Sequence, residues 1–149
     1  MDYVTSRRFS LPTDATEMAR KYWYNLWRRR LWPYNNLKPG DRLWWTENKT
    51  RLIVWESRVV RVERFEYSSR NEAVSKFVSL FGWFEPEPYF EEAATSGFGL
   101  AYKVQPMKLL NMVRPPKIRL LQQGWQVLDP GTVEALTDEA AGRTSGPDF

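Results

Sequence analysis

The sequence predicts an α+β domain whose strands form a small, bent and mostly antiparallel β-barrel flanked by helices. A strand region rich in isoleucine and valine covers residues 51–66, and its alternation slips around Glu56–Arg58. Such a slip indicates the bulge or bend that a small barrel needs in order to close. Helix signals lie on both sides of this region, and 149 residues suit one domain.

The composition removes several classes of chemistry. Apolar residues make up 42% of the chain and charged residues 27%, as in globular proteins. The chain contains no cysteine and no histidine, which excludes disulfides, thiol nucleophiles, histidine general bases and metal sites built from either residue. We therefore expect no cofactor and no bound metal.

Hydropathy indicates an intracellular protein. No segment approaches the roughly 18 consecutive apolar residues of a transmembrane helix. Residues 1–20 lack the apolar core of a signal peptide. We expect a soluble, cytoplasmic protein with no membrane partner.

The first third of the chain predicts a strand and a long helix. Residues 3–9 form the strand, and Pro12–Asp14 open the helix with a capping residue. Apolar positions then recur every four residues, at Met18, Tyr22 and Leu26. The helix is expected to include the arginines at 28–30, whose charge suits a helix C-terminus, and to end before Pro33.

The middle of the chain predicts a hairpin, a second helix and a long loop. A Lys38–Asp41 turn precedes a strand at 42–46, which a polar turn connects to the long strand region. Ser69–Glu72 has the form of a capping box, and Gly82 ends the helix that follows. Residues 82–97 form a loop long enough to suggest a function. It carries four aromatic residues, Trp83, Phe84, Tyr89 and Phe90.

The C-terminal part is less regular. Residues 99–106 predict a strand, 107–112 a helical turn or a strand edge, and 118–128 an element whose type the pattern leaves open. From Asp129 onward the residues are small and acidic. We expect a domain over 1–128 and a partly disordered tail over 129–149, with the disorder centred on 142–149.

Charge is distributed unevenly. Residues 1–70 carry a net charge of +7, residues 71–128 of +1 and residues 129–149 of −4. Arginine supplies 15 of the 22 basic residues, and 15% of the chain is aromatic. Because arginine binds phosphate and aromatic rings stack on bases, this composition favours a nucleic-acid partner.

Three stretches resemble the EVE and YTH-like modules of the PUA-like superfamily. Tyr3–Ser6 is similar to their first strand, and Leu37–Trp45 to their Gly-Asp turn entering the second strand. Tyr102–Pro106 is similar to their closing strand, together with the later Leu109-Leu110 and Pro115-Pro116. The resemblance spans roughly residues 3–128. It implies a five- or six-stranded bent barrel that binds nucleic acid and holds a flipped, often modified base in an aromatic pocket.

The resemblance also implies site residues. Trp23 or Trp27 would be the first aromatic residue of the pocket, and Trp83 and Phe84 would form its second group. The polar tip at Thr46–Asn48 would read a base edge. Trp44 and Trp45 face opposite sides of their strand, so one is core and Trp45 is the candidate to line the pocket. The candidate base-binding residues are therefore Trp23, Trp27, Trp83, Phe84, Trp45, Thr46 and Asn48.

Arginines on the basic half are the candidates for phosphate contact. They are Arg7, Arg8, Arg28, Arg29, Arg30 and Arg58. The plainer interpretation places the tryptophans in the core and the arginines on a solvated surface. As a reader of methylated DNA or RNA, the chain would serve as the specificity domain of a restriction or RNA-processing system, with a fused or separate nuclease or other effector as partner.

Two alternatives stay open. The aromatic loop at 82–97 would anchor a protein partner in an interaction module. Asp41, Glu47 and Lys49 superficially resemble the acidic pair and lysine of metal-dependent nucleases. Asp41 and Glu47 would stand about 20 Å apart along a strand, however, too far for one metal ion. We therefore expect no enzyme.

Overall fold

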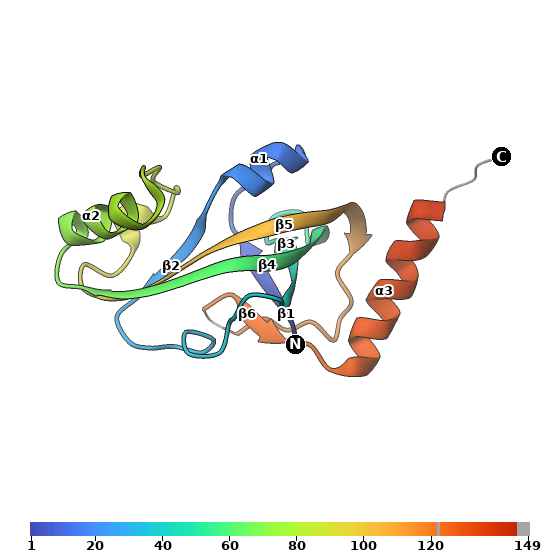
Figure 1. The fold of residues 1–149 in the computed structure, drawn as a ribbon. Coiled ribbons are helices and arrows are strands. Elements are labelled where there is room, and N and C mark those ends of the chain that lie inside the picture. Colours follow the sequence, from blue (N-terminus) through green and yellow to red (C-terminus); the bar gives the residue numbers. More distant parts are fainter. Residues whose placement is uncertain (122, 146–149) are drawn as a thin grey trace.

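Six strands form one curled, open sheet in the order β2-β5-β4-β3-β1-β6, with three α-helices around it (Figure 1). The computed structural model describes residues 1–121 and 123–145. The strands are β1 Asp2–Arg7, β2 Trp23–Trp27, β3 Arg42–Glu47, β4 Leu52–Tyr67, β5 Gly97–Val113 and β6 Trp125–Val127. The helices are α1 Ala15–Arg20, α2 Arg70–Phe81 and α3 Pro130–Ser145, with a 3₁₀ turn, η1, at Phe90–Glu92.

The long β4–β5 hairpin gives the sheet its curl. The two strands pair antiparallel from Leu52–Val113 to Tyr67–Gly97, with register shifts along β4. One shift lies between Glu56 and Ser57, where the sequence predicted a slip. β1 pairs parallel with β3, and the other pairings are antiparallel. The predicted α+β fold, with a bent, mostly antiparallel sheet flanked by helices, is therefore confirmed, and the predicted barrel takes the form of a curled half-barrel.

The predicted helix over residues 13–30 is wrong beyond Arg20. α1 ends there, the backbone of Lys21 is extended, and residues 23–27 form β2. Tyr22, Tyr24 and Leu26 are buried on the side of α2, whereas Trp23 lies in the cluster on the other side of the sheet. Tyr22 and Leu26 fit both a helical and a strand period, and the aromatic content of 22–27 favours the strand.

The second helix forms as predicted. The Ser69 hydroxyl accepts a hydrogen bond from the Glu72 backbone N–H at 3.1 Å, which caps the first turn of α2. Gly82 ends the helix in the left-handed conformation, with φ of 87°. Glycine adopts this conformation without the steric cost that a β-carbon brings.

Residues 130–145, part of the tail that the sequence predicted to be partly disordered, form α3. Asp129 accepts a hydrogen bond from the Thr132 backbone N–H at 2.8 Å, and Pro130 is the first helical residue. Leu136 and Ala140 are buried on one side of the helix, a spacing that the small, acidic composition conceals. Residues 146–149, which the same prediction included, lie outside the described residues.

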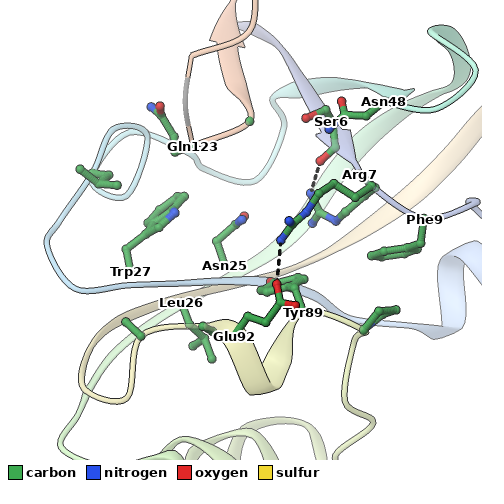
Figure 2. A pocket seen from close by; sticks show the side chains of 16 residues that line it. Ser6, Arg7, Phe9, Asn25, Leu26, Trp27, Asn48, Tyr89, Glu92 and Gln123 are labelled. Atoms are coloured by element: carbon green, nitrogen blue, oxygen red, sulfur yellow. Dashed lines mark hydrogen bonds and ion pairs between the residues drawn. The ribbon is translucent and has the colours of Figure 1, made fainter.

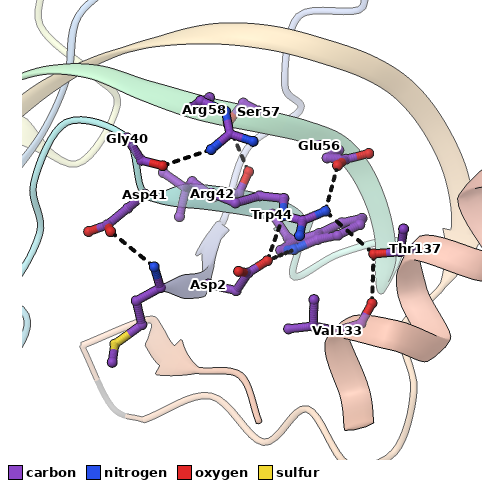
Figure 3. A network of polar contacts seen from close by, with 12 residues as sticks. Asp2, Gly40, Asp41, Arg42, Trp44, Glu56, Ser57, Arg58, Val133 and Thr137 are labelled. Carbon is purple, nitrogen blue, oxygen red and sulfur yellow. Dashed lines mark hydrogen bonds and ion pairs between the residues drawn. The ribbon is translucent and has the colours of Figure 1, made fainter. Parts of the chain in front are cut away.

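A polar network ties α3 to the sheet (Figure 3). Arg42 on β3 forms ion pairs with Asp2 at 2.7 Å and with Glu56 at 3.1 Å. The same guanidinium donates to the Thr137 hydroxyl at 3.4 Å, and that hydroxyl donates to the Val133 carbonyl. β1, β3, β4 and α3 are thus held at one place.

The described residues form three apolar clusters. α3 covers one of them and α2 another. The third contains an aromatic ring from each of the six strands: Tyr3, Trp23, Trp45, Trp55, Tyr102 and Trp125. Within the described residues, no helix is long and apolar enough to span a membrane.

Candidate functional site

A cavity of about 1000 Å³ lies at the open seam of the curled sheet (Figure 2). β2 and β6 are the two edges of this sheet and pair with different neighbours. Side chains join them across the seam, because Asn25 Oδ1 accepts a hydrogen bond from Trp125 Nε1 at 3.1 Å. The lining comes from the end of β1, from β2, and from the loops at residues 31, 48, 88–94 and 123–124.

Arg7 is buried in the wall of this cavity. Its Nη1 donates to the Thr5 hydroxyl at 3.1 Å and to the Ser6 carbonyl at 3.0 Å. Its Nη2 donates to the Tyr102 hydroxyl at 2.6 Å. The guanidinium also lies over the ring of Trp45, 5.2 Å from the centroid. Arg7 is therefore held rigidly by the protein itself.

Glu87 is the charged partner of Arg7 inside the protein. Arg7 Nε and Glu87 Oε2 are 3.7 Å apart, and neither Glu87 oxygen has a hydrogen-bond partner within the described residues. Burial raises the pKa of Glu87, although Arg7 opposes this shift. Burial alone would lower the pKa of Arg7. Tyr102 and Glu87 outweigh this effect, so the pKa of Arg7 is raised above its ordinary value and the guanidinium keeps its charge.

The rim of the cavity carries an exposed ion pair and apolar side chains. Arg8 and Glu92 pair at 3.5 Å, and both side chains are 71% exposed. Trp27 is half-buried and points into the cavity from β2, while Phe9 and Leu31 add apolar surface. An exposed ion pair such as Arg8–Glu92 contributes little to the stability of the fold.

The structure brings four of the predicted site residues together. Arg7, Arg8, Trp27 and Asn48 all line the seam cavity. Asn48 is exposed in the β3–β4 turn, and its backbone N–H donates to the Arg7 carbonyl at 2.9 Å. These residues come from three separate parts of the chain.

Three further candidates lie in the core and do not line the cavity. Trp23 is 2% exposed and packs against Trp45, with 4.9 Å between the ring centroids. Trp45 is fully buried, and its indole N–H donates to the Ser57 hydroxyl. Thr46 is also fully buried and donates to the Leu52 carbonyl. As placed here, none of the three has an exposed surface for a base.

The aromatic loop at 82–97 packs inward. Trp83 stands edge-on to Tyr22, with 4.9 Å between centroids, and Phe84 stacks on Phe77 at 5.4 Å. Both rings belong to the cluster under α2 and do not line the seam cavity. The exposed aromatic anchor of the protein-interaction alternative is not assembled by this loop.

The remaining predicted arginines lie outside the cavity. Arg28, Arg29 and Arg30 are exposed in the segment that follows β2, where Arg30 pairs with Glu66 at 3.5 Å. Arg58 is exposed on β4 and donates to the Gly40 carbonyl at 2.8 Å.

Asp41 and Glu47 have structural roles at the two ends of β3. One Asp41 oxygen is 3.3 Å from the amino group of Met1, and the other accepts from the Lys38 backbone. Glu47 accepts from the Leu11 backbone N–H at 2.7 Å. Within residues 1–121 and 123–145, no group of three or more acidic side chains is placed to hold a metal ion.

The sequence analysis missed Asn25, Tyr102 and Glu87. Asn25 is the one polar residue in the run Trp23–Trp27, and strand alternation places it on the same face as the two tryptophans. That signal was available once the segment was recognised as a strand. Tyr102 and Glu87 carry no such signal, because their role depends on contact with the distant Arg7.

The fold is similar to crystal structures of ASCH from Zymomonas mobilis. The match to this protein has a TM-score of 0.59 at 13% sequence identity, covering 92% of this chain and 94% of that one. Two substituted forms match with TM-scores of 0.59 and 0.60 at 15% and 14% identity, covering 93% and 92% of this chain and 95% and 96% of theirs. No family model and no curated protein matches the sequence.

These likenesses bear on the fold. The neighbours are ASCH domains, so the predicted PUA-like architecture is confirmed. The narrower resemblance to EVE and YTH-like modules stays a prediction.

Proposed function

We propose that the seam cavity binds one nucleotide of a nucleic-acid strand and that the chain acts as a reader, without chemistry on the base. The observation that carries this proposal is the lining of the cavity, which combines the ring of Trp27 with the side-chain amides of Asn25 and Asn48. Its volume of about 1000 Å³ lies at the upper end of small-molecule sites, which leaves room for a sugar as well as a base.

The base would stack on Trp27. Stacking of a base on an aromatic side chain contributes about 1–3 kcal/mol and tolerates any base. Asn25 and Asn48 add hydrogen-bonding groups that distinguish one base edge from another. Phe9 and Leu31 offer apolar surface to a methyl group, whose burial adds about 0.8 kcal/mol. A methylated base that pairs weakly is also easier to flip out of a duplex.

Arginines around the mouth would contact the phosphates. Arg8 lines the cavity, and its exposed pair with Glu92 is weak enough for a phosphate to replace. Arg28 and Arg29 are exposed directly after Trp27, and no carboxylate of the described residues forms an ion pair with either. A reader of this kind would act through a fused or separate effector, such as a nuclease.

Fluorescence anisotropy of labelled oligonucleotides tests this function. We expect saturable binding that is tighter for single strands than for duplexes and that weakens steeply between about 50 and 200 mM salt. Arg8→Gln should weaken binding, whereas Lys76→Gln, which removes an exposed charge on α2, should not. Absence of binding to RNA and DNA at low salt would refute the proposal. Equal affinity for methylated and unmethylated strands would refute its modified-base part.

A further inference from the structure

Asn25 is held in one orientation at the floor of the seam cavity. Its Oδ1 atom accepts from Trp125 Nε1 at 3.1 Å and from the Tyr102 hydroxyl at 3.5 Å. An indole N–H is only a donor, so the amide atom facing Trp125 must be the oxygen. Turning the amide over would set two donors against each other.

The Tyr102 hydroxyl is fixed in the same direction. Arg7 Nη2 donates to this hydroxyl at 2.6 Å, and a guanidinium has no acceptor to offer in return. The Tyr102 proton is therefore free to point to Asn25. Arg7 therefore donates to Tyr102, and Tyr102 donates to Asn25 Oδ1. The indole N–H of Trp125 donates to the same oxygen.

This arrangement leaves the amide nitrogen of Asn25 for the cavity. Asn25 projects from β2 into the cavity (Figure 2). No described residue accepts a hydrogen bond from its Nδ2, and this nitrogen is not sealed inside the protein. The floor therefore presents an N–H donor and no acceptor at this point.

We propose that Asn25 selects a base with a keto oxygen at the contact, as in uracil, over one with an amino group there, as in cytosine. This inference rests on the proposed function of the cavity. A keto oxygen accepts from Nδ2, whereas an amino group would face it donor to donor and leave both desolvated and unpaired. At position 4 uracil has a keto oxygen, an acceptor, and cytosine an amino group, a donor; at the neighbouring N3 the order is reversed, because uracil carries a proton there and cytosine does not. Position 4 is therefore the contact at which an N–H donor favours uracil over cytosine.

Fluorescence anisotropy with labelled oligomers of uracil and of cytosine tests the inference. The two oligomers have the same length and are both RNA or both DNA, whichever binds. The natural protein should bind the uracil oligomer about tenfold more tightly. Asn25→Asp keeps an oxygen for Trp125 and Tyr102 but replaces the donor by an acceptor, so the preference should invert. Asn71→Asp adds the same charge at an exposed position on α2 and should leave the preference unchanged.

A change in the ligand provides a test that needs no variant. An oligomer of 2-pyrimidinone lacks the group at position 4 and should bind the natural protein more weakly than uracil. Equal affinity for uracil, cytosine and 2-pyrimidinone would overturn the role of Asn25 while leaving the proposed function intact. Failure to bind any oligomer would instead refute the proposed function.

Discussion

The guanidinium of Arg7 donates a 2.6 Å hydrogen bond to the hydroxyl of Tyr102, and both side chains are buried. Ninety-five residues separate them in sequence. The contact joins β1 to β5 beside the seam and sets the direction of the hydrogen bond from Tyr102 to Asn25. The buried charge of Arg7 thus supports both the fold and the floor of the cavity.

Removing one member of the Arg7–Glu87 pair should destabilise the protein strongly. Arg7→Met leaves the buried carboxylate of Glu87 without its counter-charge, and loss of one partner from a buried pair costs about 3–5 kcal/mol. Urea unfolding of Arg7→Met, Glu87→Gln and the double variant measures the coupling. The double variant should be more stable than the sum of the two single losses predicts. Additive losses would show that the two side chains do not interact.

More of the fold than of the candidate site could be predicted from the sequence. The capping box at Ser69 and the slip at Glu56 are local signals, because neighbouring residues determine them, and both predictions are confirmed. The segment after Arg20 was misjudged because Tyr22 and Leu26 satisfy two periodicities at once. Only contact with the sheet decides between them.

The site depends on contacts between distant parts of the chain. Trp27 and Asn48 could be proposed from residue type, but nothing local distinguishes Trp27 from the buried Trp23. Strand alternation puts both on one face, and the position of each along the curled sheet decides which reaches the cavity. The contact of Glu87 with Arg7 bridges 80 residues and leaves no trace in the sequence pattern.

Stability should fall in alkaline solution as buried tyrosines lose their protons. Burial raises the pKa of Tyr102 to about 12, although Arg7 acts against the shift. The unfolded chain releases this proton near pH 10, whereas the folded protein holds it to about pH 12. The contribution of Tyr102 to the free energy of unfolding is therefore complete below pH 10 and is lost as the pH rises to about 12. Urea unfolding across this range should show the decline, and Tyr102→Phe should make it shallower. The same slope in both proteins would contradict the assignment.

Packing of α3 on the sheet can be tested at Leu136. This side chain is 1% exposed and belongs to the cluster with Val4 and Trp44. Leu136→Ala should cost about 2–5 kcal/mol in the free energy of unfolding, because it removes buried methyl groups and leaves a cavity. Ala135→Gly alters an exposed neighbour on the same helix and should cost about 1 kcal/mol. A negligible effect of Leu136→Ala would indicate that α3 does not pack on the sheet in solution.

The resemblance to EVE and YTH-like modules implies one pocket that contains Trp83 and either Trp23 or Trp27, but the structure separates Trp27 from Trp83. Both indoles are half-buried, but Trp27 lines the cavity and Trp83 packs under α2. Trp27→Ala should lower the affinity for single-stranded oligonucleotides by about 1–3 kcal/mol, roughly 5- to 150-fold, because a stacking surface is lost. Trp83→Ala removes an equal ring away from the cavity and should leave affinity unchanged.

Anisotropy titration measures both affinities, and urea unfolding checks that each variant is folded at the temperature used. Trp27→Phe should retain part of the affinity, since phenylalanine still offers a ring for stacking. The reverse result, with binding lost in Trp83→Ala and kept in Trp27→Ala, would move the base away from the seam cavity to the surface around Trp83, beside α2. The seam cavity would then need another ligand, because its stacking surface would have no effect on nucleic-acid binding.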